Sequence, residues 1–426
     1  MAESLRFELS SCTHKIPDQS CITVPQEIID KLYQHTLILQ QHADTVGFSK
    51  KNAPLQYLDS YYKEHILNHL KEFLLKYSVI SFFYQQLREQ HILTAGEPRL
   101  VDISLAPEKD AQYIFQFTPV KKVAVRDWRY LPFKSPIRKK YKDIDKQASN
   151  FITEERAQHG HHDEITPGDW VLFEITLLNQ NQKPLLKNLS ESLWIQIGAE
   201  ETSEPFRNLF LGKKKGEHFT SNHLCLQEYF SQNDYDYFFD IFIKEILPYH
   251  YFCLDSFKRH FRLKSDRKMH QKIVEVYSFR NDISLRRAMI EEAFLLINRT
   301  YPIDVPESVV IRQEKILREE LQTNPDYTVY KLQSDFDQKV RLLAEKQVRE
   351  NILIDHFALQ ENINIDDSDV FGYLNLTKRP RTKEFIHFLH PEIRANEEEL
   401  PIPHESLKYL CIKEKTINHI LYHFTK

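Results

Sequence analysis

Glycine is unusually scarce in this chain, and the scarcity restricts the folds and the chemistry that the chain can support. The sequence has 8 glycines among 426 residues, whereas average usage of about 7% would give roughly 30. Sites that cradle phosphates or dinucleotides need several glycines at fixed spacing, because the backbone must approach the ligand closely. We therefore expect neither a phosphate loop nor a dinucleotide-binding fold.

The length predicts more than one domain. At roughly 150 residues per domain, 426 residues correspond to about three domains. Hydrophobic residues make up 41% and charged residues 28%, close to the averages of globular proteins, so neither disorder nor a fibrous repeat is expected. The net charge is −4, which excludes a basic field over the whole chain, so any contact with nucleic acid must be local.

Targeting and cysteine patterns favour a soluble, cytoplasmic protein. The N-terminal residues lack the charged start and apolar stretch of a signal peptide, and the longest apolar run, residues 73–84, is interrupted by Lys76. The cysteines show no paired spacing, which argues against a disulfide framework or a zinc site; they are Cys12, Cys21, Cys225, Cys253 and Cys411. We expect no metal and no cofactor.

A helical hairpin is predicted near the N-terminus. Apolar residues at spacings of three and four predict a helix of about twenty residues from Pro25 and a longer one from Pro54 to about His91. Between them, GFSKKNAP (47–54) begins with a glycine that can end one helix and finishes with a proline that can open the next. The intervening residues form either an exposed contact tip or a loop in which Phe48 tucks back between the helices.

Strand and helix patterns divide the rest of the chain. Strands at 5–10, 99–105 and 111–120 would complete an α+β domain at 1–120, followed by a linker at 121–158 and a β-rich domain at 159–248. Amphipathic helices at 285–298, 306–322, 335–360 and 405–424 predict an all-helical domain at 249–426. The loop residues His159, His161, His162 and Asp163 could hold a metal, but consecutive loop histidines are more often simply polar.

Three segments resemble the bacterial trigger factor family, in the family's own order. GFSKKNAP resembles its ribosome-docking loop between two helices. PGDWVLFEI (167–175) and IGAEETSEPFRNLFLGKKKGE (197–217) resemble its FKBP-type prolyl isomerase module, and YPIDVPESVVIRQEKIL (301–317) resembles its helical chaperone domain. The resemblance covers essentially the whole chain. It implies a multidomain α+β protein whose helical domain carries arms and lies between the other two domains.

The resemblance also implies a function and partners. They are those of a ribosome-associated, ATP-independent chaperone that shields nascent and unfolded polypeptides near the exit tunnel, with ribosomal protein and RNA as docking partners and no membrane. The free protein is either a monomer or a homodimer. The implied ribosome-binding residues are Gly47, Phe48, Ser49, Lys50, Lys51 and Pro54. Ser49 stands where the family has an arginine, so docking is expected to be weaker, because lysine replaces a guanidinium fork only in part.

The isomerase motif departs further from the family. Prolyl isomerisation needs a dry aromatic pocket and no acid or base, and Phe206, Tyr229 and Phe239 (or Phe238) resemble the wall residues. The family's IPGF segment reads SEPF at 203–206, which brings a charge to an apolar rim and replaces a backbone donor by proline. Arg207 and Asn208 replace an acidic pair. The module is therefore either a degenerate isomerase, a spacer or a peptide-binding surface.

Client contacts are assigned to apolar faces of the helical domain. The candidates are Ile316, Leu317, Leu353, Phe357 and Leu359, each of which also suits a core position. Two alternative functions stay open. One is an active prolyl isomerase, and the other is a local RNA-binding protein that uses the basic segments FKSPIRKKYK (133–142) and KRPRTK (378–383).

Overall fold

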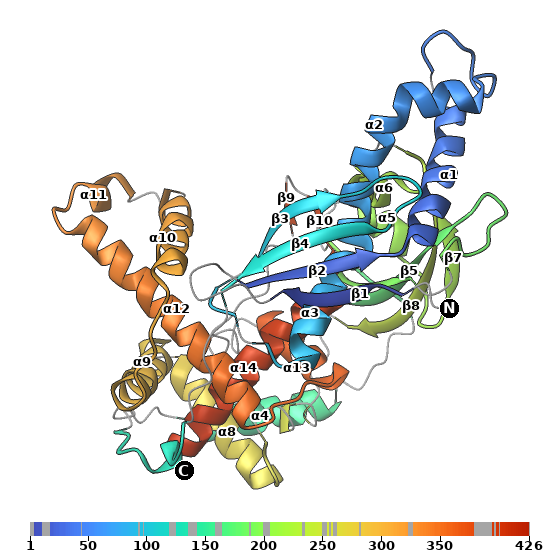
Figure 1. Ribbon diagram of the computed structural model, residues 1–426. Coiled ribbons are helices and arrows are strands. Elements are labelled where there is room, and N and C mark those ends of the chain that lie inside the picture. The colour runs from blue at the N-terminus through green and yellow to red at the C-terminus, as the bar shows by residue number, and fades with distance from the viewer. Residues whose placement is uncertain are drawn as a thin grey trace.

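The computed structural model combines two antiparallel sheets with a large helical region (Figure 1). It describes residues 4–425 except 11–17, 44, 93, 97, 119–124, 135–142, 158–163, 187–188, 199–204, 232–234, 249–253, 255–256, 259–261, 281–282, 323–326, 379–393, 396–397 and 400. Within this part of the chain, no helix is both long enough and apolar enough to cross a membrane.

The first sheet has the strand order β1-β2-β4-β3. Its strands are β1 (Arg6–Ser10), β2 (Asp18–Val24), β3 (Arg99–Ser104) and β4 (Ala111–Phe117). Three of them were predicted, but β2 was missed, because DQSCITV shows little alternation of polar and apolar residues before the helix-opening Pro25. β2 nevertheless lies inside the sheet, with Ile22 and Val24 fully buried.

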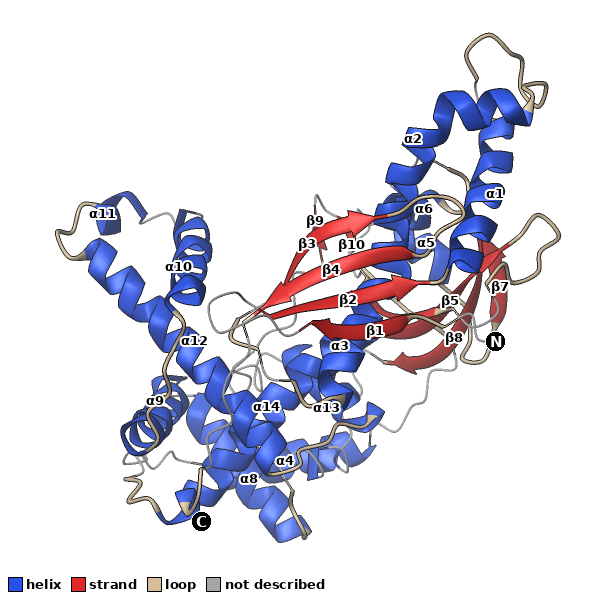
Figure 2. Cartoon of the chain, viewed as in Figure 1, coloured by secondary structure: helices blue, strands red, loops and turns tan. Residues whose placement is uncertain are grey.

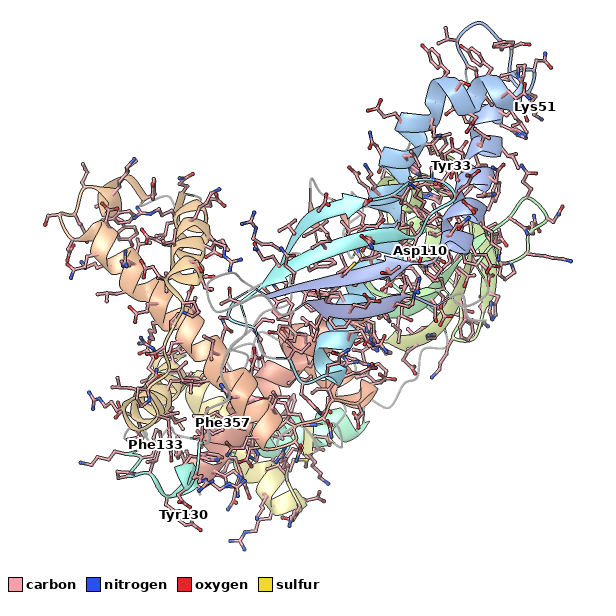
Figure 3. All side chains as sticks on the ribbon, in the orientation of Figure 1. Tyr33, Lys51, Asp110, Tyr130, Phe133 and Phe357 are labelled. Carbon is pink, nitrogen blue, oxygen red and sulfur yellow. The ribbon has the colours of Figure 1, made fainter. Side chains whose placement is uncertain are left out.

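The predicted helical hairpin is confirmed. Helix α1 (Gln26–His42) is followed by α2 (Leu55–Leu74), which continues through the π-helical turn η1 (Leu75–Val79) into α3 (Ile80–Glu89). The hairpin packs on the first sheet, where the rings of Phe83 and Phe115 stack with centroids 4.2 Å apart. At the start of α1, the Asp110 carboxylate accepts a hydrogen bond from the Gln26 amide at 2.8 Å (Figure 3), so a side chain next to β4 satisfies one of the free amides of the first helical turn.

The second sheet has the order β11-β6-β5-β8-β7. It contains β5 (Trp170–Leu178), β6 (Glu191–Gln196), β7 (His218–Ser221), β8 (Phe238–Leu247) and β11 (Ile402–Pro403), with the short helices α5 (Pro205–Phe210) and α6 (Leu224–Ser231) between strands. The edge strand β11 comes from the C-terminal region, where Ile402 pairs with Trp194. The C-terminal region therefore completes the β-rich unit.

Both faces of this second sheet are covered. On one face, Phe73 of α2 lies 4.8 Å from Tyr237, and Tyr77 of η1 lies 5.7 Å from Phe230. On the other, Trp194 meets Phe371 of α13 (Asp367–Lys378) edge-on at 5.6 Å. The expectation that the helical domain lies between the other two domains is therefore wrong. The near-continuous apolar sequence of β5 requires cover on both faces, and the hairpin supplies one of them.

The remaining helices form a body and a projecting arm (Figure 2). The body contains η2 (Trp128–Tyr130), α4 (Ile144–Ala157), α8 (Asp266–Arg280), α9 (Ile283–Thr300), α13 (Asp367–Lys378) and α14 (His404–Phe424). The arm consists of α10 (Glu307–Gln322), α11 (Tyr327–Lys331) and the first half of α12 (Phe336–Gln360), whose second half enters the body. A two-stranded ribbon pairs β9 (Arg394–Ala395) with β10 (Glu398–Glu399).

Candidate functional site: the hairpin tip and the helical arm

Backbone hydrogen bonds fix the conformation of the hairpin tip. Gly47 has φ +83° and Lys51 has φ +69°, so the chain turns twice through the left-handed region. The Lys51 amide donates to the Gln41 carbonyl at 2.9 Å, and the Asn52 side-chain amide donates to the Ser49 hydroxyl at 2.6 Å. The tip is a closed turn that presents a defined surface (Figure 3).

Aromatic rings continue from the tip along α2. The Phe48 ring lies 4.9 Å from Tyr57, which stacks on Tyr61 at 5.5 Å. The Tyr57 hydroxyl donates to the Val46 carbonyl at 3.2 Å and so holds the loop against the helix. The Phe48 ring contacts α2 but stays 38% exposed. The tip therefore has features of both alternatives predicted from the sequence, namely a ring packed against the hairpin and an exposed contact surface. Gly47, Ser49, Lys50, Lys51 and Pro54 are also exposed at this end of the molecule.

A second group of exposed apolar side chains lies on the arm. We define the arm surface as Ile311, Ile316, Val329, Tyr330, Leu332, Leu342 and Leu343, all classed among the exposed large hydrophobic residues. Leu332, just after α11, is 87% exposed. The core of the arm is small by comparison and consists of Val310, Leu317, Phe336, Val340 and Ala344. Because large exposed apolar surfaces often mark binding sites, the arm is a candidate binding surface.

The predicted client-binding residues fall in different environments. Ile316 belongs to the arm surface, whereas Leu317 lies in the core of the arm. Leu353 and Phe357 are fully buried in the body, where Phe357 meets Trp128 edge-on at 4.9 Å. Leu359 is half-buried. In this arrangement a client would reach Ile316 but not Leu353 or Phe357. The sequence did not indicate that Leu353 and Phe357 are buried, because the apolar stripe of α12 continues without a break from the arm into the body.

The aromatic residues assigned to the isomerase site are packed inside the molecule. Phe206 is buried beside Phe210 at 6.4 Å, and Phe239 is fully buried beside Phe230 at 5.5 Å. Tyr229 is half-buried, and desolvation raises the pKa of its phenol well above the usual value. Phe238 is exposed on the other side of β8. Ser203 and Glu204 lie outside the described residues, and Pro205 begins α5.

A buried polar contact that the sequence did not reveal ties the hairpin to the second sheet. The Tyr237 hydroxyl lies 2.8 Å from both Thr36 Oγ1 of α1 and His69 Nε2 of α2. Nearby, the Ser81 hydroxyl of α3 donates to Glu191 Oε1 of β6 at 2.7 Å. These partners are more than 100 residues apart in the chain, so local sequence patterns carry no sign of them.

Several other candidates predicted from the sequence fall outside the described residues. The loop residues His159, His161, His162 and Asp163 lie outside the described residues, and so do most of the basic segments at 133–142 and 378–383. Across the part of the chain that is described, no three His, Cys, Asp or Glu side chains gather in a way that could hold a metal.

Comparison with known proteins matches the sequence resemblance. The family model described as the C-terminus of bacterial trigger factor matches residues 258–390. The trigger factor of Rickettsia canadensis (strain McKiel) is 19% identical over 348 residues, covering 80% of this chain and 78% of that protein. The trigger factor of Geotalea uraniireducens (strain Rf4) is 22% identical over 353 residues, covering 78% of each.

A solved structure of the trigger factor chaperone covers 97% of this chain and 99% of its own, with 14% identity and a TM-score of 0.35. The sequence matches run through most of the chain, and the family model falls on the helical region that carries the arm. The chain is thus similar in sequence to bacterial trigger factors over about four fifths of its length.

Proposed function

We propose that this protein is a chaperone that binds unfolded polypeptide through the arm surface and docks at the ribosome through the hairpin tip. The observation that carries the proposal is the gathering of seven exposed apolar side chains on the arm. Relationship to trigger factor supports the chaperone role. A cytoplasmic location is part of the proposal.

Binding through the arm surface needs no nucleotide. Burying one large aliphatic side chain contributes about 1.5–3 kcal/mol, and association itself costs about 4–15 kcal/mol. Simultaneous contacts by several arm residues therefore give affinities that are useful but reversible. A client that buries its own apolar groups by folding loses these contacts and dissociates.

Docking through the tip would combine an apolar contact with two cations. Phe48 presents an exposed ring on a fixed turn, with Lys50 and Lys51 beside it. Lysine attracts phosphate as a point charge, so the contact should weaken as salt screens it. The apolar contribution of Phe48 should persist at higher salt.

The arm proposal is tested by suppression of aggregation of a chemically denatured protein, followed by light scattering. We expect Val329→Ser combined with Leu332→Ser to raise the chaperone concentration needed for half-suppression several-fold. A matched control is Val101→Ser, which removes an exposed apolar side chain from the first sheet. Equal losses in both variants would mean that the arm has no special role.

The docking proposal is tested by co-sedimentation with bacterial ribosomes at two salt concentrations. The intact chain should pellet with ribosomes, and the variant with Phe48→Ala, Lys50→Ala and Lys51→Ala should not. Tyr130→Ala, which removes an exposed aromatic ring on the helical side of the molecule, should pellet like the intact chain. Failure of the intact chain to pellet at either salt concentration would leave a free holdase and remove the ribosome from the proposal.

For the β-rich module we propose a structural role in holding the hairpin. The burial of Phe206 and Phe239, and the packing of α2 and η1 against the same face of the sheet, support this role. Catalysis of a proline-containing test peptide by the intact chain would contradict it and restore the isomerase alternative. The RNA-binding alternative requires steeply salt-dependent binding to free RNA, and the net charge of −4 disfavours it.

A further inference from the structure

Exposed cations gather on the helical body, on the opposite side of the molecule from the hairpin tip (Figure 1). Residues 258–272, which lead into and begin α8, contain seven Lys and Arg and one Asp, although the net charge of the whole chain is −4. The segment 126–134 contributes further cations. We define the basic surface as the exposed residues Arg126, Lys134, Arg262, Lys264, Arg267 and Lys268.

A buried network holds the two segments of the basic surface together. The Arg262 guanidinium donates to His419 Nδ1 of α14 at 2.6 Å, and the ring centroids of His419 and Trp128 are 5.9 Å apart. Glu361, just after α12, accepts hydrogen bonds from the Trp128 indole at 2.9 Å and from His419 Nε2 at 3.3 Å. Both segments are therefore fixed to the same part of the body, so that their cations share one surface.

The cations of the basic surface differ from those of α12 in their partners. Three cations of α12 pair with carboxylates, namely Lys339 with Asp335, Arg341 with Glu307 and Lys346 with Glu291. Within the part of the chain that the structure describes, none of the six cations of the basic surface pairs with a carboxylate. Two carboxylates beside them are engaged by other cations, Asp266 by Lys258 and Glu361 by Arg129. Asp127 alone does not cancel the positive charge.

The chemistry of the basic surface suits a partner with closely spaced negative charges. RNA carries one phosphate per nucleotide, and three of the six cations are arginines, whose planar forks can bind phosphate through two hydrogen bonds. Each phosphate that a cation neutralises also releases counterions from the RNA, which adds affinity that falls as salt rises. Charge complementarity therefore favours an RNA backbone as the partner.

Building on the proposed docking at the ribosome, we propose that the basic surface is a second contact, made with the phosphate backbone of ribosomal RNA. Alone, such a surface would bind RNA only weakly, with a Kd of about 10⁻⁴–10⁻⁶ M at physiological salt. With the hairpin tip bound at another point of the ribosome, the second contact becomes intramolecular and strengthens docking. The contact is local, as a chain with a net charge of −4 requires.

The test is a co-sedimentation titration with bacterial ribosomes at about 50 mM and about 200 mM salt. The variant with Lys264→Ala, Arg267→Ala and Lys268→Ala should bind roughly tenfold more weakly than the intact chain at the lower salt concentration. Its plot of log K against log salt should be shallower by about 2–3, close to one for each phosphate contact removed. All three side chains are exposed, so the variant should fold normally.

A matched control separates the basic surface from the charge of the whole chain. The variant with Lys339→Ala, Arg341→Ala and Lys346→Ala removes the same number of cations, but each of these is already paired with a carboxylate. It should keep the affinity and the salt slope of the intact chain. Equal losses in the two variants would overturn the assignment to the basic surface.

A second measurement distinguishes RNA from an acidic protein segment as the partner. Fluorescence anisotropy at about 50 mM salt compares a labelled single-stranded RNA of about twelve nucleotides with a labelled polyglutamate of about the same length. We expect the intact chain to bind the RNA at least about tenfold more tightly, because counterions condense on the phosphate backbone. The variant of the basic surface should lose this binding. Equal affinity for the two probes would overturn the assignment to RNA.

The outcomes separate the second contact from the docking on which it rests. If the variant of the basic surface keeps both the affinity and the salt slope of the intact chain, the second contact is wrong and docking through the hairpin tip stands. If the intact chain does not pellet with ribosomes at either salt concentration, the proposed docking fails and the second contact fails with it.

Discussion

The hairpin core and the helical arm use apolar side chains in opposite ways. Phe73, Tyr77 and Tyr237 are fully buried where the hairpin meets the second sheet, whereas Leu332 and Leu342 of the arm lie mostly in solvent. The first region uses its apolar surface for stability within the chain. The second keeps its surface open and gives up that stability, which is what binding an outside polypeptide requires. The following predictions test this difference.

The largest expected effect is in the hairpin core. Phe73→Ala removes a ring that packs against Tyr77, Phe230 and Tyr237, and should lower the free energy of unfolding by about 3–5 kcal/mol. Urea unfolding followed by circular dichroism measures it. A loss below about 1 kcal/mol would mean that hairpin and sheet do not share a core.

Glu191 gives a pH-dependent test of the same junction. Desolvation raises the pKa of this buried carboxyl to about 8, so the folded protein keeps a proton that the unfolded chain releases near pH 4.5. Stability therefore falls as pH rises from about 4.5 to about 8. Glu191→Gln should unfold much like the intact chain at about pH 5 and be more stable by about 4 kcal/mol at about pH 8.

The measurement for Glu191 is urea unfolding of both proteins at the two pH values. Ser81→Ala is the companion variant, since it removes the hydroxyl that donates to Glu191 and should leave the slope with pH in place. A variant Glu191→Gln whose stability falls with pH as steeply as that of the intact chain would show that another group titrates.

A smaller effect is expected for Tyr237→Phe. The hydroxyl contacts Thr36 and His69, and its removal leaves these buried groups without that partner at a cost of about 1–3 kcal/mol. Thermal unfolding should show the loss. Tyr61→Phe provides a control on an exposed ring of α2 and should change stability by less than about 0.5 kcal/mol.

The smallest effect on stability is expected on the arm. Leu332→Ser should change the free energy of unfolding by less than about 0.5 kcal/mol, because the side chain is 87% exposed. The same variant should bind a labelled unfolded peptide more weakly than the intact chain, which a fluorescence-anisotropy titration measures. A large loss of stability would show that the arm surface is covered in the free protein and would weaken the contrast with the hairpin core.

Local patterns predicted the elements well. The hairpin followed from apolar spacing bounded by Gly47 and Pro54, and the long helices α10, α12 and α14 followed from their amphipathic stripes. The turn at the hairpin tip could also be predicted from the sequence, because the backbone preferences of glycine and proline do not depend on distant contacts. The short strands β2 and β11 were not, since strand pairing depends on partners far along the chain.

The candidate sites were predicted less completely. Phe48 and Ile316 lie on exposed surfaces as a contact role requires, but Leu353 and Phe357 are core residues of the body. An apolar stripe indicates that a helix face is either buried against the rest of the chain or available to bind a partner. The stripe alone does not distinguish these two cases.

What the sequence determined by itself was local: the scarcity of glycine argued against phosphate-cradling chemistry, helical periodicity predicted the hairpin and the helices of the arm, and short motifs resembled those of trigger factors. Only the tertiary structure decided which apolar faces are buried inside the molecule and which stay exposed. The reason is physical. Burial is a property of two surfaces that meet, so the fate of Phe73 depended on Tyr237, more than 160 residues away, and that of Leu332 on the absence of any such described neighbour.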